Sequence, residues 1–512
     1  MEYHLKKRIY LLSLLCIVLI SSCKKSKEKL SSQNSANQSL ADKPNIIIIY
    51  TDDQSQEDIG YFRKLSGLGS PTDSTTPNID KLAKDGIAFN QFYTAAPVCT
   101  PSRVALLTGK KPESAGLIGN AYGDKGLKAE LNMATYFRSQ GYQTALIGKW
   151  HLGHTEEFHP NKKGFDRFFG HLSGVVDNYT YVYRWPKQNP KNHAYDLYEN
   201  TVLQEQYQNN PNNRHLAHLL MDKAKEYITQ ASAPLFMYYA INQPHYPVQP
   251  LEIPNTDSAS AEVKAEAYYQ AFVKTIDTMV GRLINDLEAA GKLDNTIIVF
   301  QSDHGHSFES RNWDGIDATL ENKGTVYRND TNYSYRSGKF STFEGGIRVP
   351  AIIRFPKKPK FDKLRGIVRE GMAVSIDWFP TLAALVTQEP VPSNYDLEGF
   401  NLIEHMKDNR TVVREKYFWH HFGRGFAYRD DNLKLLYMPV DSVKGDNLAE
   451  NYLPGYYLVD LDTNLKEDLQ RDLKATLKAD FTRMRQEALE LYKVSCSKVS
   501  NRSCGNQDLL TP

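Results

Sequence analysis

A run of four consecutive isoleucines near the start of the chain constrains the fold more than any other stretch. It lies within residues 45–50, between an asparagine and a tyrosine. A continuous β-branched run of this length is typical of a strand buried on both faces of a parallel sheet. Further apolar segments of the same kind follow at residues 144–147, 235–241, 296–300 and 349–355.

Helical patterns separate these strands, at residues 78–85, 133–140, 215–230 and 261–290. Strands that alternate with helices predict an α/β fold, with a large sheet flanked by helices on both faces. After residue 387 the pattern changes to short strands, at 416–422, 425–429, 433–438 and 456–461, followed by a helix at 474–492. We therefore expect a catalytic unit at 44–390 and a smaller C-terminal α+β subdomain at 391–512, with an antiparallel sheet and a packed helix.

The N-terminus has the features of an export signal at residues 1–22. Lys6, Lys7 and Arg8 precede an apolar run at residues 11–20, which is too short to span a bilayer. The sequence Ile-Ser-Ser-Cys that ends at Cys23 resembles a bacterial lipobox, which implies a lipid on Cys23; an ordinary cleaved signal is the alternative. Residues 23–43 are polar and predict a flexible linker. We expect an exported lipoprotein, anchored to the membrane and periplasmic or at the cell surface.

Charge and the remaining cysteines say little about partners. The chain has 62 Lys and Arg against 60 Asp and Glu, and no nucleic-acid motif, so we exclude nucleic acid as a partner. Cys496 and Cys504 lie eight residues apart in a polar tail. In an exported protein this spacing permits a disulfide, with two free thiols as the alternative.

Acidic residues follow two of the predicted strands. Asp52 and Asp53 come after the strand at 45–50, and Asp303 and His304 come after the strand at 296–300. Sites in α/β sheets form at the carboxyl ends of strands, so these side chains are expected to meet. Three carboxylates and one imidazole favour a hard divalent cation such as Ca²⁺, whereas turn and helix-cap roles are the alternative.

Residues 98–103 predict the start of a helix, with Thr100 as the N-cap and Pro101 in the first helical position. Cys99 would then lie just ahead of a helix N-terminus, in a positive field that favours anions and thiolates. Arg103, about one turn further on, can point back toward the same place. A capped helix with an incidental cysteine is the alternative.

Three further segments with basic side chains follow or precede strands. Lys149 and His151 lie two residues apart after the strand at 144–147, a spacing that would place them on one side of an extended segment. His245 lies in a loop between two prolines, and Lys339 precedes a glycine-rich turn. Each of these, taken alone, is also compatible with a solvated loop.

Together these segments resemble the type I sulfatases of the alkaline-phosphatase superfamily. The residues that carry the resemblance are Cys-Thr-Pro-Ser-Arg at 99–103, which fits C-x-P-S-R, and Gly-Lys-Trp-His-Leu-Gly at 148–153. The resemblance implies an alkaline-phosphatase-like, mixed and mainly parallel sheet. It also implies that a formylglycine-generating enzyme converts Cys99 to formylglycine (3-oxoalanine), whose hydrate is the nucleophile.

The resemblance implies a role for each site residue. Asp52, Asp53, Asp303, His304 and the formylglycine at position 99 would hold one Ca²⁺. Lys149 would contact a sulfate oxygen and His151 the formylglycine hydrate, while His245 and Lys339 would act at the leaving group and Arg103 would add positive charge. Many relatives carry Asn where this chain has His304, and His there is expected in the zinc-dependent phosphodiesterases of the superfamily.

The expected function is therefore hydrolysis of a sulfate ester, with a sulfated polysaccharide or oligosaccharide as substrate. Residues 165–198 and 306–335 are polar and aromatic, which suits a sugar-binding wall or ordinary loop insertions. Two alternatives stay open: a phosphodiesterase or phosphonate hydrolase of the same superfamily, and a non-catalytic glycan-binding lipoprotein.

Overall fold

The computed structural model describes residues 42–67, 76–182, 195–208, 214–256, 261–307, 335–387, 390–423, 425–439 and 454–499, and residue 504. The predicted signal, the lipid site at Cys23 and nearly all of the linker lie outside the described residues. Residues 183–194 of the first predicted sugar-binding segment and residues 308–334 of the second also lie outside the described residues.

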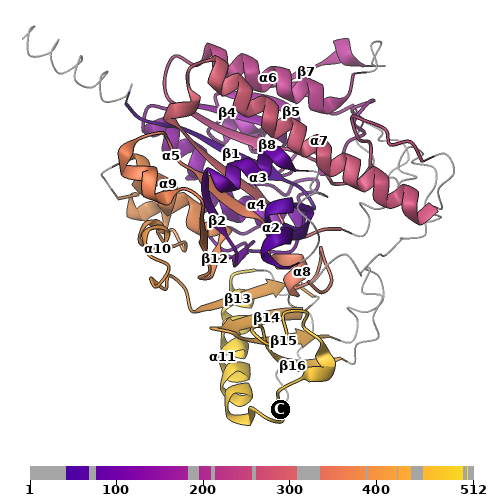
Figure 1. Cartoon of the computed structure of the whole chain (residues 1–512), viewed down its shortest axis with the longest axis vertical. Helices are drawn as coiled ribbons and strands as arrows, with labels where there is room; N and C mark the ends of the chain where they lie inside the picture. The colour runs from indigo at the N-terminus through magenta and orange to yellow at the C-terminus, as the bar shows by residue number, and fades with distance from the viewer. Residues whose placement is uncertain are drawn as a thin grey trace, which may run out of the picture.

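A ten-stranded mixed sheet forms the centre of the molecule (Figure 1). Its strand order is β11-β2-β10-β9-β1-β8-β4-β5-β6-β7. The strands are β1 (Asn45–Thr51), β2 (Gly86–Phe89), β4 (Gln143–Lys149), β5 (Arg167–His171), β6 (Tyr198–Glu199), β7 (Val202–Leu203), β8 (Leu235–Ala240), β9 (Thr296–Ser302), β10 (Ala351–Arg354) and β11 (Ile367–Arg369).

The predicted strands are confirmed, and the isoleucine run is β1. It pairs in parallel with β8 on one side and with β9 on the other, so it is central. The segment at 349–355 differs from the expectation, because β10 runs antiparallel to both β9 and β2. The sheet is therefore parallel from β9 to β5 and reverses at the strand beyond β9.

Helices cover both faces of the sheet. Their bounds are α2 (Gly60–Leu65), α3 (Pro77–Lys84), α4 (Cys99–Thr108), α5 (Met133–Ser139), α6 (Leu216–Gln230), α7 (Ala261–Ala289), α8 (Glu344–Ile347), α9 (Trp378–Val386), α10 (Ile403–Lys407) and α11 (Lys478–Ser497). In Figure 1, α6 and α7 lie together on one side of the sheet, and α5 and α9 lie on the other.

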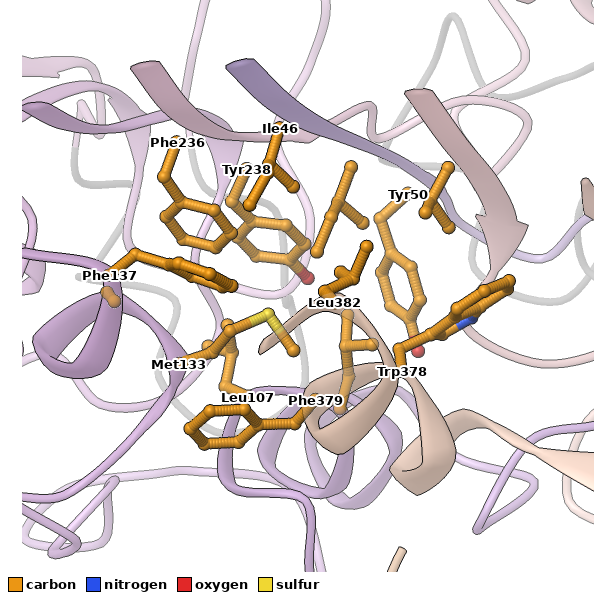
Figure 2. Packing of buried hydrophobic residues seen from close by; sticks show 14 of the residues in the cluster. Ile46, Tyr50, Leu107, Met133, Phe137, Phe236, Tyr238, Trp378, Phe379 and Leu382 are labelled. Carbon is orange, nitrogen blue, oxygen red and sulfur yellow. The ribbon is translucent and has the colours of Figure 1, made fainter. Parts of the chain in front are cut away.

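Successive side chains of β1 point to opposite faces of the sheet, so this one apolar strand contributes to two hydrophobic cores. Ile46 and Tyr50 point into the core that contains residues of α4, α5 and α9. In Figure 2 these two side chains lie opposite Leu107, Met133 and other residues of those helices. Ile48 enters the same core, whereas Ile47 and Ile49 enter the second core, built with α3, α6 and α7. Both faces of β1 are fully buried, as the sequence pattern predicts.

The C-terminal part contains a four-stranded antiparallel sheet, as expected (Figure 1). Its strands, in spatial order, are β13 (Lys416–His421), β14 (Gly425–Asp430), β15 (Leu433–Met438) and β16 (Gly455–Asp460). One face packs against α11 through Phe418 and Met484. The other face packs on the catalytic unit, where Trp419 Nε1 donates a hydrogen bond to the Thr94 carbonyl at 2.8 Å. The boundary at residue 390 stays a prediction.

Cys496 and Cys504 form a disulfide across a Cα–Cα distance of 5.9 Å. This outcome fits the disulfide that the spacing permits. Of the helices in the described part of the chain, none is long and apolar enough to cross a membrane.

Candidate active site

Four neighbouring parallel strands carry most of the predicted site residues at or just beyond their carboxyl ends. In the sheet these strands stand in the order β9-β1-β8-β4. Asp303 and His304 follow β9, Asp52 and Asp53 follow β1, and the loop with His245 follows β8. Lys149 is the last residue of β4. Because parallel strands end at the same edge, these side chains converge.

Asp52 lies at the centre of the positive side chains. It is fully buried, and its carboxylate contacts Lys149 Nζ and, at 3.2 Å, Arg103 Nη2. Its other oxygen lies 3.8 Å from Cys99 Sγ. Burial alone would raise the pKa of Asp52, but the nearby charges, Lys149 first, hold it well below its ordinary value. Asp52 is therefore ionised.

Asp53 faces the other side of the same cluster. Its backbone has φ of 63°, in the left-handed region that non-glycine residues seldom adopt. Lys339 Nζ lies 2.9 Å from Asp53 Oδ1, and His304 Nε2 lies 3.3 Å from the same oxygen. Burial raises the pKa of Asp53 to about 6, in spite of Lys339 and His304.

Cys99 is the first residue of α4, and this corrects the predicted helix start. The N-cap is Val98 rather than Thr100, and no side chain caps the helix. The Thr100 hydroxyl instead donates to the His151 carbonyl at 2.7 Å and accepts from the Ala121 amide at 3.2 Å. The prediction failed because Thr100 is used to join α4 to two other segments.

Arg103 points back to the start of its own helix, as expected. One Nη2 atom contacts both Asp52 at 3.2 Å and Asp303 at 3.0 Å. The guanidinium is fully buried and lies over the Tyr50 ring, 5.5 Å from its centroid. A buried positive charge with two carboxylate partners is fixed in place, so Arg103 holds the two strand ends together.

His304 closes the cluster beside the cysteine. Its Nε2 lies 3.3 Å from Cys99 Sγ and 3.4 Å from Asp303 Oδ1. Its Nδ1 lies 3.0 Å from the Gly305 carbonyl, which only accepts, so Nδ1 carries a proton. Burial would lower the pKa of His304, but Asp303, Cys99 and Asp53 raise it to about 9. In its neutral form, His304 would offer the Nε2 lone pair to a cation held among the carboxylates.

The cluster fits a single divalent cation. Ligand atoms of Asp52, Cys99, Asp303 and His304 lie within 4.8 Å of one another, as do those of Asp52, Asp53, Cys99 and His245. Three buried carboxylates repel one another unless positive charge lies between them, and oxygen donors prefer a hard cation. The residues predicted for Ca²⁺ are therefore brought together, and His245 is an additional neighbour that the sequence did not suggest as a ligand.

The interpretation of Lys149 and His151 as alternating residues on an extended segment is wrong. Lys149 ends β4, but His151 has φ of 53°, so the chain turns between them. His151 Nδ1 is buried, and among the described residues it has no hydrogen-bond partner. Burial, with the charges of Lys149 and Arg103, holds the pKa of His151 well below its ordinary value. The ring is therefore neutral, and one of its nitrogens carries a lone pair.

His245 is held in a loop by backbone contacts. The peptide bonds before Pro244 and Pro247 are both cis. His245 Nδ1 donates to the Tyr246 carbonyl at 2.8 Å, and its Nε2 lies 3.9 Å from Asp53 Oδ2. Burial and Lys339 hold the pKa of His245 well below its ordinary value.

Lys339 is placed by a turn that the sequence located only approximately. Its amide donates to the His306 carbonyl at 2.8 Å, and the Phe340 amide donates to the Pro97 carbonyl at 2.9 Å. These contacts bring residue 339 beside the segment that leads to Cys99. All predicted site residues thus meet in one buried cluster.

Two supporting residues were missed by sequence reasoning. Ser102 Oγ donates to the Asp303 carbonyl at 2.5 Å, and its place in the C-x-P-S-R signature was a signal that could have found it. Asn178 contacts the loop of His245 from a distant segment, where no motif marks it.

The sulfatase family model matches residues 44–388. This chain belongs to the sulfatase family. It is therefore a sulfuric ester hydrolase. It is 31% identical over 401 residues to the N-acetylgalactosamine-6-sulfatase of Sus scrofa, covering 73% of this chain and 68% of that protein. It is also 31% identical over 442 residues to human arylsulfatase A, covering 81% and 79%.

Solved structures of sulfatases share the fold. The structure of Ps i-CgsB in complex with k-i-k-neocarrahexaose superposes with a TM-score of 0.70 and 26% identity, covering 91% of this chain and 96% of that one. PsFucS1 sulfatase from Pseudoalteromonas sp. superposes with a TM-score of 0.66, and its 23% identity, over 92% and 95% of the chains, supports the fold alone.

Proposed function

We propose that this sulfatase hydrolyses a sulfate ester on a sulfated polysaccharide or oligosaccharide, using formylglycine made from Cys99 and one bound Ca²⁺. The observation that carries the proposal is the position of Cys99 Sγ, 3.8 Å from Asp52 Oδ1 and 3.3 Å from His304 Nε2. A side chain at this place lies among the candidate metal ligands and at the positive end of α4.

Asp52, Asp53, Asp303, His304 and the side chain at position 99 would hold the Ca²⁺. When bound, the ion supplies positive charge next to the attacked sulfate group. The fit rests on the donor set: ligand atoms of Asp52, Cys99, Asp303 and His304 lie within 4.8 Å of one another, and oxygen donors of buried carboxylates suit a hard cation.

Formylglycine, if made from Cys99, would supply a hydrate hydroxyl as the nucleophile toward sulfur. The chain's own residues prepare the place for the sulfate. Lys149 and Lys339 extend their ammonium groups into the cluster from opposite sides, one against Asp52 and the other against Asp53. Preorganised positive charge of this kind stabilises the charge that gathers on the sulfate oxygens.

Two histidines are suited to different proton transfers. His151 is neutral and buried, and its main-chain carbonyl accepts from Thr100, the residue after Cys99, so it is suited to accept a proton near position 99. His245 lies on the Asp53 and Lys339 side of the cluster. There it would assist the departing alcohol, together with Lys339.

The substrate class is proposed from relatives. The first curated relatives are N-acetylgalactosamine-6-sulfatases, and Ps i-CgsB was solved with a bound oligosaccharide. Export as a lipoprotein, with a lipid on Cys23, and maturation by a formylglycine-generating enzyme belong to the same proposal. A tethered extracellular enzyme would meet polymeric sulfated glycans.

A phosphonate or phosphodiester hydrolase is the second candidate. The phosphonate monoester hydrolase of Agrobacterium radiobacter superposes with a TM-score of 0.57, but its 18% identity supports the fold alone. A non-catalytic glycan-binding protein would have no need for a buried cysteine surrounded by charged residues.

The test is release of inorganic sulfate from a panel of defined sulfated oligosaccharides, compared with hydrolysis of phosphate diesters and phosphonate esters on the same preparation. We expect kcat/KM to be highest for a sulfated sugar. Faster turnover of a phosphate or phosphonate ester would contradict the proposal, and absence of any turnover by protein with formylglycine at position 99 would favour the binding role.

A further inference from the structure

A cavity of about 680 Å³ opens between the catalytic unit and the C-terminal sheet. One wall is formed by the segment 116–128, which joins α4 to α5. The opposite wall is formed by Phe422 and Gly423 after β13 and by residues 498–499 after α11. We propose that this cavity is a subsite for an anionic group, a sulfate or a carboxylate, on a sugar next to the one that loses its sulfate. This inference rests on the proposed function.

The first wall is bonded directly to the catalytic segment. The Ala121 amide donates to Thr100 Oγ1 at 3.2 Å, and the same hydroxyl donates to the His151 carbonyl at 2.7 Å. Thr100 follows Cys99 in the chain. The Leu127 amide also donates to the Leu152 carbonyl at 2.8 Å. The segment 116–128 thus lies along the Cys99 and His151 side of the site.

The opposite wall reaches the other side of the site. His421 Nδ1 donates to the Phe340 carbonyl at 2.8 Å, and the two rings stack with their centroids 6.3 Å apart. Phe340 follows Lys339, and His421 precedes Phe422 in the lining. Both walls of the cavity are therefore covalently continuous with segments that carry the site residues, and from this continuity we infer that a glycan chain bound at the site extends beside the cavity.

The charge of the lining favours an anion. Lys125, Lys128 and Lys498 line the cavity against a single acid, Asp124. Lys125 and Lys128 are exposed, and within the described residues neither ammonium has a hydrogen bond or an ion pair. Lys498 is already bonded to Ser114 Oγ at 2.8 Å and lies 3.5 Å from Glu398. Two lysines are thus available to a sulfate or carboxylate, each as a point charge on a flexible stem.

The polar character of the wall suits a sugar ring. Gly116 and Gly119 line the cavity, and a Cβ at either position would meet nothing within 4 Å, so the backbone there is open to a ligand. Asn120, which follows Gly119 in the lining, has a buried Oδ1 that lacks a partner among the described residues. An unpaired buried acceptor is costly, and a sugar hydroxyl would satisfy it.

The test measures binding without turnover, in a Cys99→Ala background. Isothermal titration calorimetry would compare three oligosaccharide probes of equal length: a sulfated dextran oligosaccharide (dextran sulfate), an oligogalacturonate and an unsulfated dextran oligosaccharide (neutral dextran). The variant is Lys125→Gln/Lys128→Gln. The matched control, Lys81→Gln/Lys84→Gln, removes the same charge from exposed lysines on α3, which does not line the cavity.

We expect the lysine variant to bind dextran sulfate about 3- to 30-fold more weakly, the range for two exposed ion pairs, with the loss shrinking at high salt. The control should bind as tightly as the parent. An equivalent loss for oligogalacturonate would identify carboxylate as a second acceptable anion. No loss in the lysine variant, an equal loss in the control, or equally tight binding of neutral dextran would overturn the proposal.

A kinetic arm separates this inference from the proposed function. With Cys99 intact, the lysine variant should hydrolyse 4-nitrophenyl sulfate at the parent rate, because this small ester does not reach the cavity. If the parent enzyme hydrolyses no sulfate ester, the proposed function fails while the binding result still decides on the anionic subsite. If the lysine variant loses turnover of 4-nitrophenyl sulfate as well as binding of dextran sulfate, the lysines act in the catalytic cluster and the proposed subsite is wrong.

Discussion

The Asn178 carboxamide oxygen accepts a hydrogen bond from Gln243 Nε2 at 3.0 Å. The same oxygen accepts from Asn242 Nδ2 at 3.2 Å, and Asn178 Nδ2 donates to the Pro247 carbonyl at 3.4 Å. One fully buried side chain therefore holds both ends of the loop that carries His245. The loop is also tied to the metal cluster, because the Asp52 amide donates to the Gln243 carbonyl at 3.1 Å.

The first prediction concerns Asn178 as a positioning residue. Asn178→Ala leaves two buried amide donors unpaired and loosens the loop, so kcat on a sulfated sugar should fall by about tenfold, the effect of a lost buried hydrogen-bond partner. The fall on 4-nitrophenyl sulfate should be smaller, because a nitrophenolate needs little help to leave. The measurement is the ratio of kcat/KM on the two substrates. Asn178→Asp, which keeps the acceptor, should recover part of the ratio; equal losses on both substrates would assign Asn178 a purely structural role.

The second prediction separates the two histidines. His245→Ala should lose about 10²–10⁴-fold on a sulfated sugar, the typical contribution of a general acid, and distinctly less on 4-nitrophenyl sulfate. His151→Ala should reduce turnover of both substrates alike, because its proton transfer follows loss of the alcohol. Steady-state kinetics of each variant on both substrates provides the test. If His245→Ala lost the same fraction of activity on both substrates, His245 would act in substrate positioning instead.

The third prediction concerns position 99. Peptide mass spectrometry of active enzyme, produced with a formylglycine-generating enzyme, should show the aldehyde or its hydrate at residue 99. Cys99→Ala should abolish turnover and preserve the fold, since a buried cysteine behaves as a small apolar residue. Unmodified thiol as the sole species in fully active enzyme would refute the formylglycine mechanism.

Sequence alone predicted most of the sheet, and the side chains that it singled out lie near one another in the structure. The isoleucine run and the other continuous apolar segments are typical of strands buried on both faces of a central sheet. Because site residues follow the strand ends directly, their convergence was also predictable from the fold class. The antiparallel direction of β10 was not, since an apolar run has the same composition in either direction.

What the sequence could not predict depends on contacts between distant segments. The left-handed backbone of His151 requires support from neighbouring loops, because a non-glycine residue there has no local reason to adopt it. Threonine is a residue type favoured at helix N-caps, yet the Thr100 hydroxyl forms hydrogen bonds with the His151 carbonyl and the Ala121 amide instead. Asn178 lies 65 residues before Gln243, outside every recognisable motif.

The fourth prediction concerns the metal. Removal of divalent ions should abolish activity, and Ca²⁺ should restore it, because Asp52, Asp53 and Asp303 are all fully buried oxygen donors. His304→Asn should keep Ca²⁺ dependence and much of the activity, since an amide oxygen is also a Ca²⁺ ligand. Activity assays on chelated enzyme with added Ca²⁺, Mg²⁺ or Zn²⁺ test this. Recovery with Zn²⁺ but not Ca²⁺ would favour the phosphodiesterase alternative.

The last prediction concerns a buried charge cluster that joins the two parts of the molecule. Lys434 Nζ, on β15, lies 2.8 Å from both Glu344 Oε1 and Glu467 Oε1, and all three side chains are fully buried. Glu344 begins α8, just after the turn of Lys339. Removing the shared cation leaves two buried carboxylates uncompensated, so Lys434→Met should lower the free energy of unfolding by about 3–5 kcal/mol. The matched control is Lys416→Met on β13, which is 45% exposed and should cost about 1 kcal/mol or less.

The same cluster should give stability a specific pH dependence. Burial raises the pKa of Glu467 to about 7, although Lys434 opposes the shift, whereas an unfolded glutamate has a pKa of about 4.3. Between these values the folded protein binds more protons than the unfolded chain, so this group's contribution to stability falls as pH rises from about 4.3 to 7. Glu467→Gln cannot ionise, so the decline across this window should become shallower. Urea unfolding of both proteins at pH 5, 6, 7 and 8 measures the difference, and identical slopes would show that Glu467 is ionised throughout because Lys434 compensates its burial.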